Sequence, residues 1–91
     1  MIAKPNYSYQ ADTAYMPPSN GFNYLWVMVD EVSLYTALFP MRDLSVTAVC
    51  NCIDKFLTLM PKFTILKTDY GGENSKALTK HLAQYNILHW N

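Results

Sequence analysis

The pattern of apolar and polar positions predicts three strands in the first half of the chain. Residues 7–15 alternate and are rich in aromatic and β-branched side chains, which favours a strand. The run PPSNG at 17–21 then predicts a loop. Residues 23–30 are almost continuously apolar, which is typical of a central strand buried on both faces. A turn at 30–33 and a returning strand at 34–41 would complete an antiparallel hairpin.

A helical pattern follows these strands. Apolar residues recur every three or four positions between Val46 and Met60, which predicts an amphipathic helix of about 17 residues. Asp43 has a side chain suited to the N-cap of this helix. Pro61 would end it, because proline has no amide hydrogen to donate.

The last third of the chain predicts a strand at 63–68, a second helix and a strand at 87–90. The strand at 63–68 follows a helix, so it should enter the sheet parallel to a neighbour. Asn74 or Ser75 would cap the second helix. This order of elements predicts one compact α/β unit with a mixed sheet. The printed sequence stops just after Trp90, so we expect the last strand and one sheet face to lack a covering helix.

Length and composition agree with one packed domain over residues 1–91. The chain has 91 residues, 51% of them hydrophobic and 14% aromatic, with no repeat and no linker. No apolar run reaches the roughly 18 to 20 residues that span a bilayer, and the N-terminus lacks a signal pattern. We therefore expect a soluble intracellular protein, in the nucleus or the cytoplasm, with no membrane partner.

Neither the net charge nor the cysteines indicate a function: the charge does not point to nucleic-acid binding, and the cysteines do not form a zinc site. Seven basic residues balance seven acidic ones, so charge alone does not indicate a nucleic-acid partner. Cys50 and Cys52 point in different directions on the predicted helix, and no His or Cys pair completes a zinc set. We expect reduced thiols in or near the core, in a reducing compartment.

Two carboxylates are the candidate functional groups. Asp69 lies in the run KTDYGGEN, at the exit of an apolar strand and before a glycine turn and a helix. Asp12 lies in the run SYQADT on the first predicted strand. Two strand-borne carboxylates suggest a divalent-metal site. The structural alternatives stay open: Asp69 can stabilise the dipole of the following helix, and Asp12 can be an ordinary polar residue near the end of a strand.

Three segments together resemble the catalytic core of retroviral and retrotransposon integrases, in the ribonuclease H-like superfamily. Residues 9–13 (YQADT) are similar to the first strand of that family with its leading catalytic Asp. Residues 24–33 (YLWVMVDEVS) are similar to its apolar second strand and Asp-x-x-Ser/Thr turn. Residues 64–73 (TILKTDYGGE) are similar to the strand and Asp-Asn-Gly-x-Glu-Phe motif with the second catalytic Asp. The resemblance runs from about residue 8 to the end, in the family's order and spacing.

The resemblance implies a fold and a chemistry. The fold would be ribonuclease H-like α/β, with a mixed five-stranded sheet, three strands antiparallel and the rest connected by helices, and at least two helices. Asp12 and Asp69 would be catalytic metal ligands for Mg²⁺ or Mn²⁺, and DNA would be the partner. The reaction would be DNA integration, by cleavage of phosphodiesters and strand transfer. Self-association into a homo-oligomer is a separate expectation, which rests on the uncovered sheet edge and not on the resemblance.

The sequence departs from the family at three places. Tyr70 stands where the family has Asn, and Asn74 where it has Phe, so the packing at the cleft mouth should differ. The family's third metal ligand is a Glu on a helix about 35 residues beyond the second Asp, and it is absent from this sequence. Glu73 is not expected to replace it, because the family carries its own Glu at this place besides the catalytic one.

The other polar residues are expected to have structural roles. Asp30 should serve the hairpin turn. Gly71 and Gly72 either form a tight turn with positive φ or let backbone amides approach a phosphate. Two histidines, His81 and His89, are expected to pack. Three lysines could contact DNA phosphates but are expected to form a solvated face: Lys67, Lys76 and Lys80.

Two hypotheses follow from the sequence. The first is a C-terminally truncated integrase core, a polynucleotidyl transferase fragment that is inactive or nearly so, because two carboxylates hold two metals poorly. Whether the chain is an enzyme is left open by the incomplete Asp-Asp-Glu triad. The alternative is a non-catalytic remnant that serves as a protein interaction module, through an uncovered sheet edge and the apolar face near Trp90.

Overall fold

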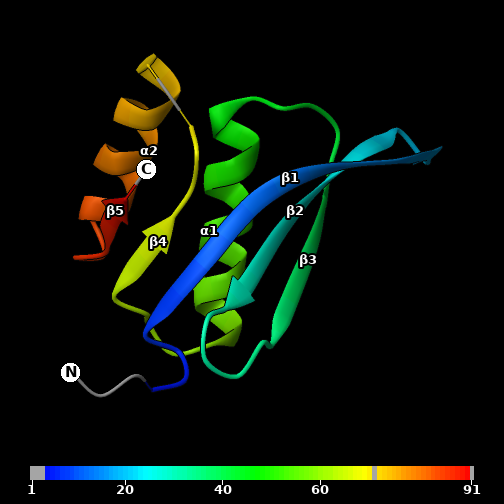
Figure 1. Cartoon of the computed structure of the whole chain (residues 1–91). Coiled ribbons are helices and arrows are strands. Elements are labelled where there is room, and N and C mark those ends of the chain that lie inside the picture. Colours follow the sequence, from blue (N-terminus) through cyan, green and yellow to red (C-terminus); the bar gives the residue numbers. More distant parts are fainter. Residues whose placement is uncertain (1–3, 71, 91) are drawn as a thin grey trace.

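The computed structural model describes residues 4–70 and 72–90, which form one mixed sheet and two helices (Figure 1). The elements are β1 (Ser8–Ser19), β2 (Phe22–Asp30), β3 (Thr36–Met41), α1 (Val46–Leu59), β4 (Ile65–Lys67), α2 (Gly72–Ala83) and β5 (Leu88–Trp90). The five strands lie in the order β3-β2-β1-β4-β5. β1, β2 and β3 pair antiparallel, whereas β4 pairs parallel with both β1 and β5. The predicted ribonuclease H-like α/β arrangement is confirmed.

The core lies between the sheet and the two helices, and α1 runs behind β1 and the end of β2 in Figure 1. Its centre is an aromatic cluster in which Tyr9, Phe56 and Phe63 have ring centroids 5.0 to 5.6 Å apart, with edge-on contacts. Leu78 and Leu82 of α2 are completely buried in the same core. The helices therefore share one face of the sheet, and no described element covers the other face.

This one-sided packing corrects the expectation for the second strand. β2 alternates: Trp26 and Met28 have no exposed surface, whereas Val27 and Val29 between them stay partly exposed. The strand is apolar on both faces, but only the face toward α1 and α2 is buried within the described residues. The prediction of a strand buried on both faces is therefore wrong for this structure.

The first strand is longer than predicted. It continues to Ser19, so the predicted loop at 17–21 reduces to a turn at Asn20 and Gly21, where φ is 54° and 84°. The pairing of β1 with β2 becomes irregular between Tyr15 and Ser19. Prolines, which cannot donate a ladder hydrogen bond, are tolerated where strand pairing is interrupted in this way.

Both helices begin away from the predicted caps. The cap of α1 is Ser45, whose hydroxyl accepts a hydrogen bond from the amide of Ala48 at 3.2 Å. Asp43 instead accepts from the amide of Ser45 at 2.9 Å, and so shapes the turn before the helix. The helix has 14 residues, fewer than expected. α2 begins at Gly72, before Asn74 and Ser75.

The predicted glycine turn lies just before α2. Gly72 has a φ of 60°, as a tight glycine turn requires, whereas Gly71 lies outside the described residues.

Within the described residues, neither α1 nor α2 could span a membrane.

Candidate active site

The register between β1 and β4 brings the two candidate carboxylates together. Gln10 lies opposite Lys67 in this parallel pair. Asp12 and Asp69 each follow one of these partners by two residues. Residues two apart on a strand share a face, so Asp12 lies on the same face as Gln10. Asp69 lies just beyond the last residue of β4, and it lines the same hollow as Asp12.

Asp12 and Asp69 line the same open hollow, which has a volume of about 610 Å³. We call it the sheet hollow, because it lies against the sheet face that carries no described helix. Its lining residues are Gln10, Ala11, Asp12, Val27, Val29, Lys67, Thr68, Asp69 and Trp90. The lining thus combines two carboxylates, one amine, an amide and an apolar floor.

The donor set of the hollow suits a hard cation but is small. Asp12 and Asp69 are both exposed, and neither takes part in an ion pair with another described residue. One oxygen of Asp12 accepts a hydrogen bond from the amide of Thr13 at 2.8 Å. Carboxylate oxygens are the ligands that Mg²⁺ and Mn²⁺ prefer. Within residues 4–70 and 72–90, however, no three His, Cys, Asp or Glu side chains converge as a metal-binding group.

Tyr70, which replaces the family's Asn, packs on the core side of the site. Its ring centroid lies 6.2 Å from that of Trp26. Burial, with a smaller contribution from the charge of Asp12, raises the pKa of the Tyr70 hydroxyl above its ordinary value. The indole nitrogen of Trp26 is buried and has no hydrogen-bond partner among the described residues. Tyr70 is therefore a neutral packing residue.

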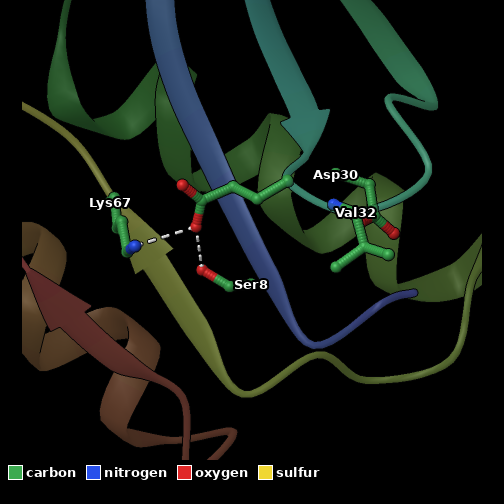
Figure 2. A network of polar contacts seen from close by, with 5 residues as sticks. Ser8, Asp30, Val32 and Lys67 are labelled. Carbon is green, nitrogen blue, oxygen red and sulfur yellow. Dashed lines mark hydrogen bonds and ion pairs between the residues drawn. The ribbon is translucent and has the colours of Figure 1, made fainter. Parts of the chain in front are cut away.

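Lys67 belongs to a polar network rather than to a solvated face. Its ammonium lies 2.9 Å from a carboxylate oxygen of Glu31, and the hydroxyl of Ser8 donates to the same oxygen. Figure 2 shows this link reaching from the turn after β2, across β1, to β4. The Ser8 hydroxyl, followed by Lys67, holds the pKa of Glu31 below its ordinary value. The prediction that Lys67 belongs to a solvated face is therefore wrong, because its ammonium pairs with Glu31. Local sequence could not show this pairing, since the two residues are far apart in the chain.

Asp30 confirms its predicted turn role, although it is only 2% exposed. Its carboxylate accepts hydrogen bonds from the backbone amides of Asn6, Val32 and Ser33. Burial opposes ionisation of Asp30, but these three amides outweigh it and hold the pKa below its ordinary value.

The histidines have structural partners, as predicted. The Nε2 atom of His81 lies 2.7 Å from a carboxylate oxygen of Asp54 in α1. His89 lies between the hydroxyls of Thr68 and Thr79, each 2.7 Å from one ring nitrogen. Burial lowers the pKa of His89, so the neutral ring is favoured.

The remaining candidates also match their predicted structural roles. Cys50 and Cys52 are free thiols, and burial raises the pKa of Cys52 to about 11. Lys76 and Lys80 are exposed on α2, and Glu73 is exposed in its first turn.

The fold and the paired carboxylates define an integrase-like α/β domain, and the comparisons with known proteins agree. The integrase core domain family matches residues 3–90, and the chain belongs to this family. A comparison with curated proteins finds no match.

Solved structures of similar fold include the following two. One is the HTLV-2 integrase catalytic core domain in complex with magnesium, in a dimeric form. It has a TM-score of 0.80 and 21% identity, over 93% of this chain and 59% of that one. The other is a simian T-cell lymphotropic virus intasome in complex with the PP2A regulatory subunit B56 gamma. It has a TM-score of 0.83 and 18% identity, over 97% of this chain and 32% of that one. The 91-residue chain therefore spans less than two thirds of the length of each of these two proteins.

Proposed function

We propose that the chain is part of an integrase-type polynucleotidyl transferase, which cuts and joins DNA phosphodiesters with the help of divalent metal ions. The observation that carries the proposal is the position of Asp12 and Asp69 in the sheet hollow. Membership of the integrase core domain family supports the reaction class.

Asp12 and Asp69 would hold Mg²⁺ or Mn²⁺ through their exposed oxygens. A bound ion of this kind polarises a phosphoryl oxygen and lowers the pKa of a water or hydroxyl nucleophile. The role of the chain's own residues is to fix the position of the bound ion, and so the place where negative charge on the phosphate is neutralised. The β1–β4 pairing holds the segments that lead into the two carboxylates side by side, and the apolar floor of Val27 and Val29 limits the water beneath them.

The 91-residue chain by itself is proposed to be inactive or nearly so. A two-metal site needs enough anionic ligands to balance two divalent cations, and Asp12 and Asp69 supply only two. The described residues place no third acidic ligand beside them. Nicking or strand transfer by the purified chain, dependent on Mg²⁺ and abolished by Asp12→Asn and Asp69→Asn, would contradict this expectation.

Metal titration tests the site. Mg²⁺ and Mn²⁺ are titrated into the chain while NMR follows its amide and carboxylate signals. We expect joint shifts with Mg²⁺, and joint broadening with Mn²⁺, at Asp12 and Asp69. Asp12→Asn and Asp69→Asn should each weaken the response at the other position. Glu73→Gln is the matched control, because it removes one exposed carboxylate on α2. A folded chain with no response at either aspartate would overturn the proposed site.

A protein interaction module is the second candidate function. It is favoured by the open sheet face and by exposed apolar residues at its edges, with Leu38 of β3 and Leu88 of β5 both 55% exposed. Self-association would also agree with the dimeric form of the HTLV-2 core. Light scattering tests it: a concentration-dependent increase in mass supports this function, and a monomer at all concentrations argues against it. An intracellular location remains a prediction, which the free thiols support.

A further inference from the structure

One row of residues crosses the sheet hollow behind the two carboxylates. Val29 lies opposite Gln10, Gln10 opposite Lys67, and Lys67 opposite Trp90, on four adjacent strands. All four residues line the hollow. Two residues along a strand advance about 7 Å. Asp12 therefore lies about one such step beyond Gln10 of this row, on the same face, and Asp69 lines the same hollow two residues after Lys67.

Lys67 is the only cationic side chain among the described residues that line the hollow. Its side chain is 35% exposed, so the ammonium can reach a ligand without first being released from the core. The ammonium has three donors, and Glu31 is the one anionic partner that the described residues give it. A nearby phosphate can therefore bind beside Glu31 or displace it.

Trp90 provides a flat apolar surface next to this cation. It is 51% exposed on β5, and the Lys67 ammonium lies 5.3 Å from the ring centroid. This contact holds the exposed indole beside the Lys67 ammonium in the lining of the hollow. An exposed tryptophan beside a lysine combines a stacking surface for a base with a charge for its phosphate.

We propose that Lys67 and Trp90 form a nucleotide seat, in which Trp90 stacks on an unpaired DNA base and Lys67 binds a backbone phosphate of the same strand. The seat positions a strand whose neighbouring phosphodiester lies at Asp12 and Asp69, and it rests on the proposed function. Glu31, anchored by Ser8, holds Lys67 in place when no strand is bound and competes with the phosphate for it. Unpaired bases are required, because stacking on an indole needs a free base face.

Oligonucleotide binding without metal tests the seat. A fluorescently labelled oligothymidylate of about ten nucleotides is titrated with the chain in EDTA at low salt. Lys67→Gln should weaken binding about tenfold and lower the salt slope by about 0.7, the value for one phosphate contact on a single strand. Lys67→Arg should retain binding. Lys76→Gln is the matched control, because it removes the same charge from α2.

Stacking is tested at Trp90 itself. Trp90→Ala should weaken binding about tenfold or more, whereas Trp90→Phe should stay within about threefold of the wild type, because a phenyl ring still stacks. In the wild-type chain, the indole N–H signal of Trp90 should shift with the oligonucleotide. That of Trp26, which has no exposed surface, should not. This readout needs no variant, so it decides the question even if a substitution prevents folding.

A substitution at Glu31 separates the seat from a purely structural ion pair. Glu31→Gln should tighten oligonucleotide binding about two- to fivefold, because a competing anion is removed. Glu73→Gln gives the same change in net charge on α2 and should have a smaller effect. A structural ion pair predicts equal effects from these two variants.

Several outcomes overturn the seat. The first is that the wild-type chain does not bind the oligonucleotide. The second is that Lys67→Gln or Trp90→Ala binds it as well as the control Lys76→Gln. The third is that binding leaves the Trp90 indole signal unmoved. Tighter binding of a blunt duplex that is insensitive to Trp90→Ala overturns it as well. Failure here with an intact metal response at Asp12 and Asp69 leaves the proposed function standing. Oligonucleotide binding without a metal response at Asp12 and Asp69 would instead overturn the proposed metal-dependent function.

Discussion

The backbone amide of Asn6 donates a hydrogen bond to the buried carboxylate of Asp30, which ties the segment before β1 to the turn after β2. The other oxygen of Asp30 accepts from the amides of Val32 and Ser33 within the turn. One carboxylate thus ties the start of β1 to the end of β2, at the open end of the β1–β2 hairpin. It also positions the adjacent Glu31, which reaches Lys67 in the sheet hollow.

Asp30→Ala should destabilise the chain by about 3 kcal/mol or more, because it leaves buried amides without an acceptor. Asp30→Asn should cost less, about 2 kcal/mol, since one amide oxygen can still serve the turn while the NH₂ group faces the amide of Asn6. Urea unfolding measures both values. Equal stability of Asp30→Ala and the wild type would show that the carboxylate contributes nothing to the hairpin.

The same carboxylate predicts an acid-sensitive stability. The folded-state pKa of Asp30 lies below its ordinary value of 3.8. Its stabilisation is therefore fully present above about pH 4 and is lost as the pH falls through the folded-state pKa. Urea midpoints between pH 7 and pH 2.5 should decline less steeply below pH 4 in Asp30→Asn. Glu31, whose pKa is also lowered, accounts for part of the remaining slope.

His89 predicts a second pH effect at milder acidity. Burial holds its pKa below the ordinary value of 6.5, so the unfolded chain binds the proton more readily than the folded chain. Its contribution to stability is present above about pH 6.5 and declines as the pH falls toward the folded-state pKa. His89→Gln should flatten this part of the profile of melting temperature against pH. An imidazole NMR signal that titrates at or above pH 6.5 would contradict the burial of this ring.

Phe56 is expected to be a major contributor to the core. It is 1% exposed and makes edge-on ring contacts with Tyr9 and Phe63. Phe56→Ala should cost about 3 to 5 kcal/mol by leaving a cavity, and it should unfold a marginally stable chain. Leu59→Ala on the same helix is the control, with an expected effect near zero because Leu59 is 76% exposed. Similar losses at the two positions would mean that α1 packs differently.

The N-terminus of α1 provides a local test. Ser45→Ala should lower the free energy of unfolding by about 1 kcal/mol, because the amide of Ala48 loses its acceptor. Asp43→Ala removes only the hydrogen bond from the Ser45 amide to the Asp43 carboxylate, in the turn before the helix, and should have a smaller effect. Thermal unfolding of the two variants in parallel decides the order. A larger loss from Asp43→Ala would support Asp43 as the functional cap, which the local sequence had predicted.

The sequence by itself determined the order of the elements and the identity of the two candidate carboxylates. Strand alternation and helical spacing are local patterns, so three strands, a helix, a strand, a helix and a strand could be predicted without knowing what packs against them. Asp12 and Asp69 stood out because each is a carboxylate on a predicted strand or at its exit. Boundaries were less predictable, as Ser19 and Ser45 illustrate, because caps and irregular pairing depend on individual hydrogen bonds.

Only the tertiary structure decided which face of β2 is buried, which partner Lys67 takes and where Asp12 and Asp69 lie relative to one another. Each of these depends on contacts between residues far apart in sequence. The packing of α1 and α2 on one face leaves Val27 and Val29 beside the sheet hollow. The β1–β4 pairing brings the segments before Asp12 and Asp69 together, and the turn after β2 brings Glu31 to Lys67. Local periodicity carries no information about such long-range pairings, because register is set by whole strands packing together.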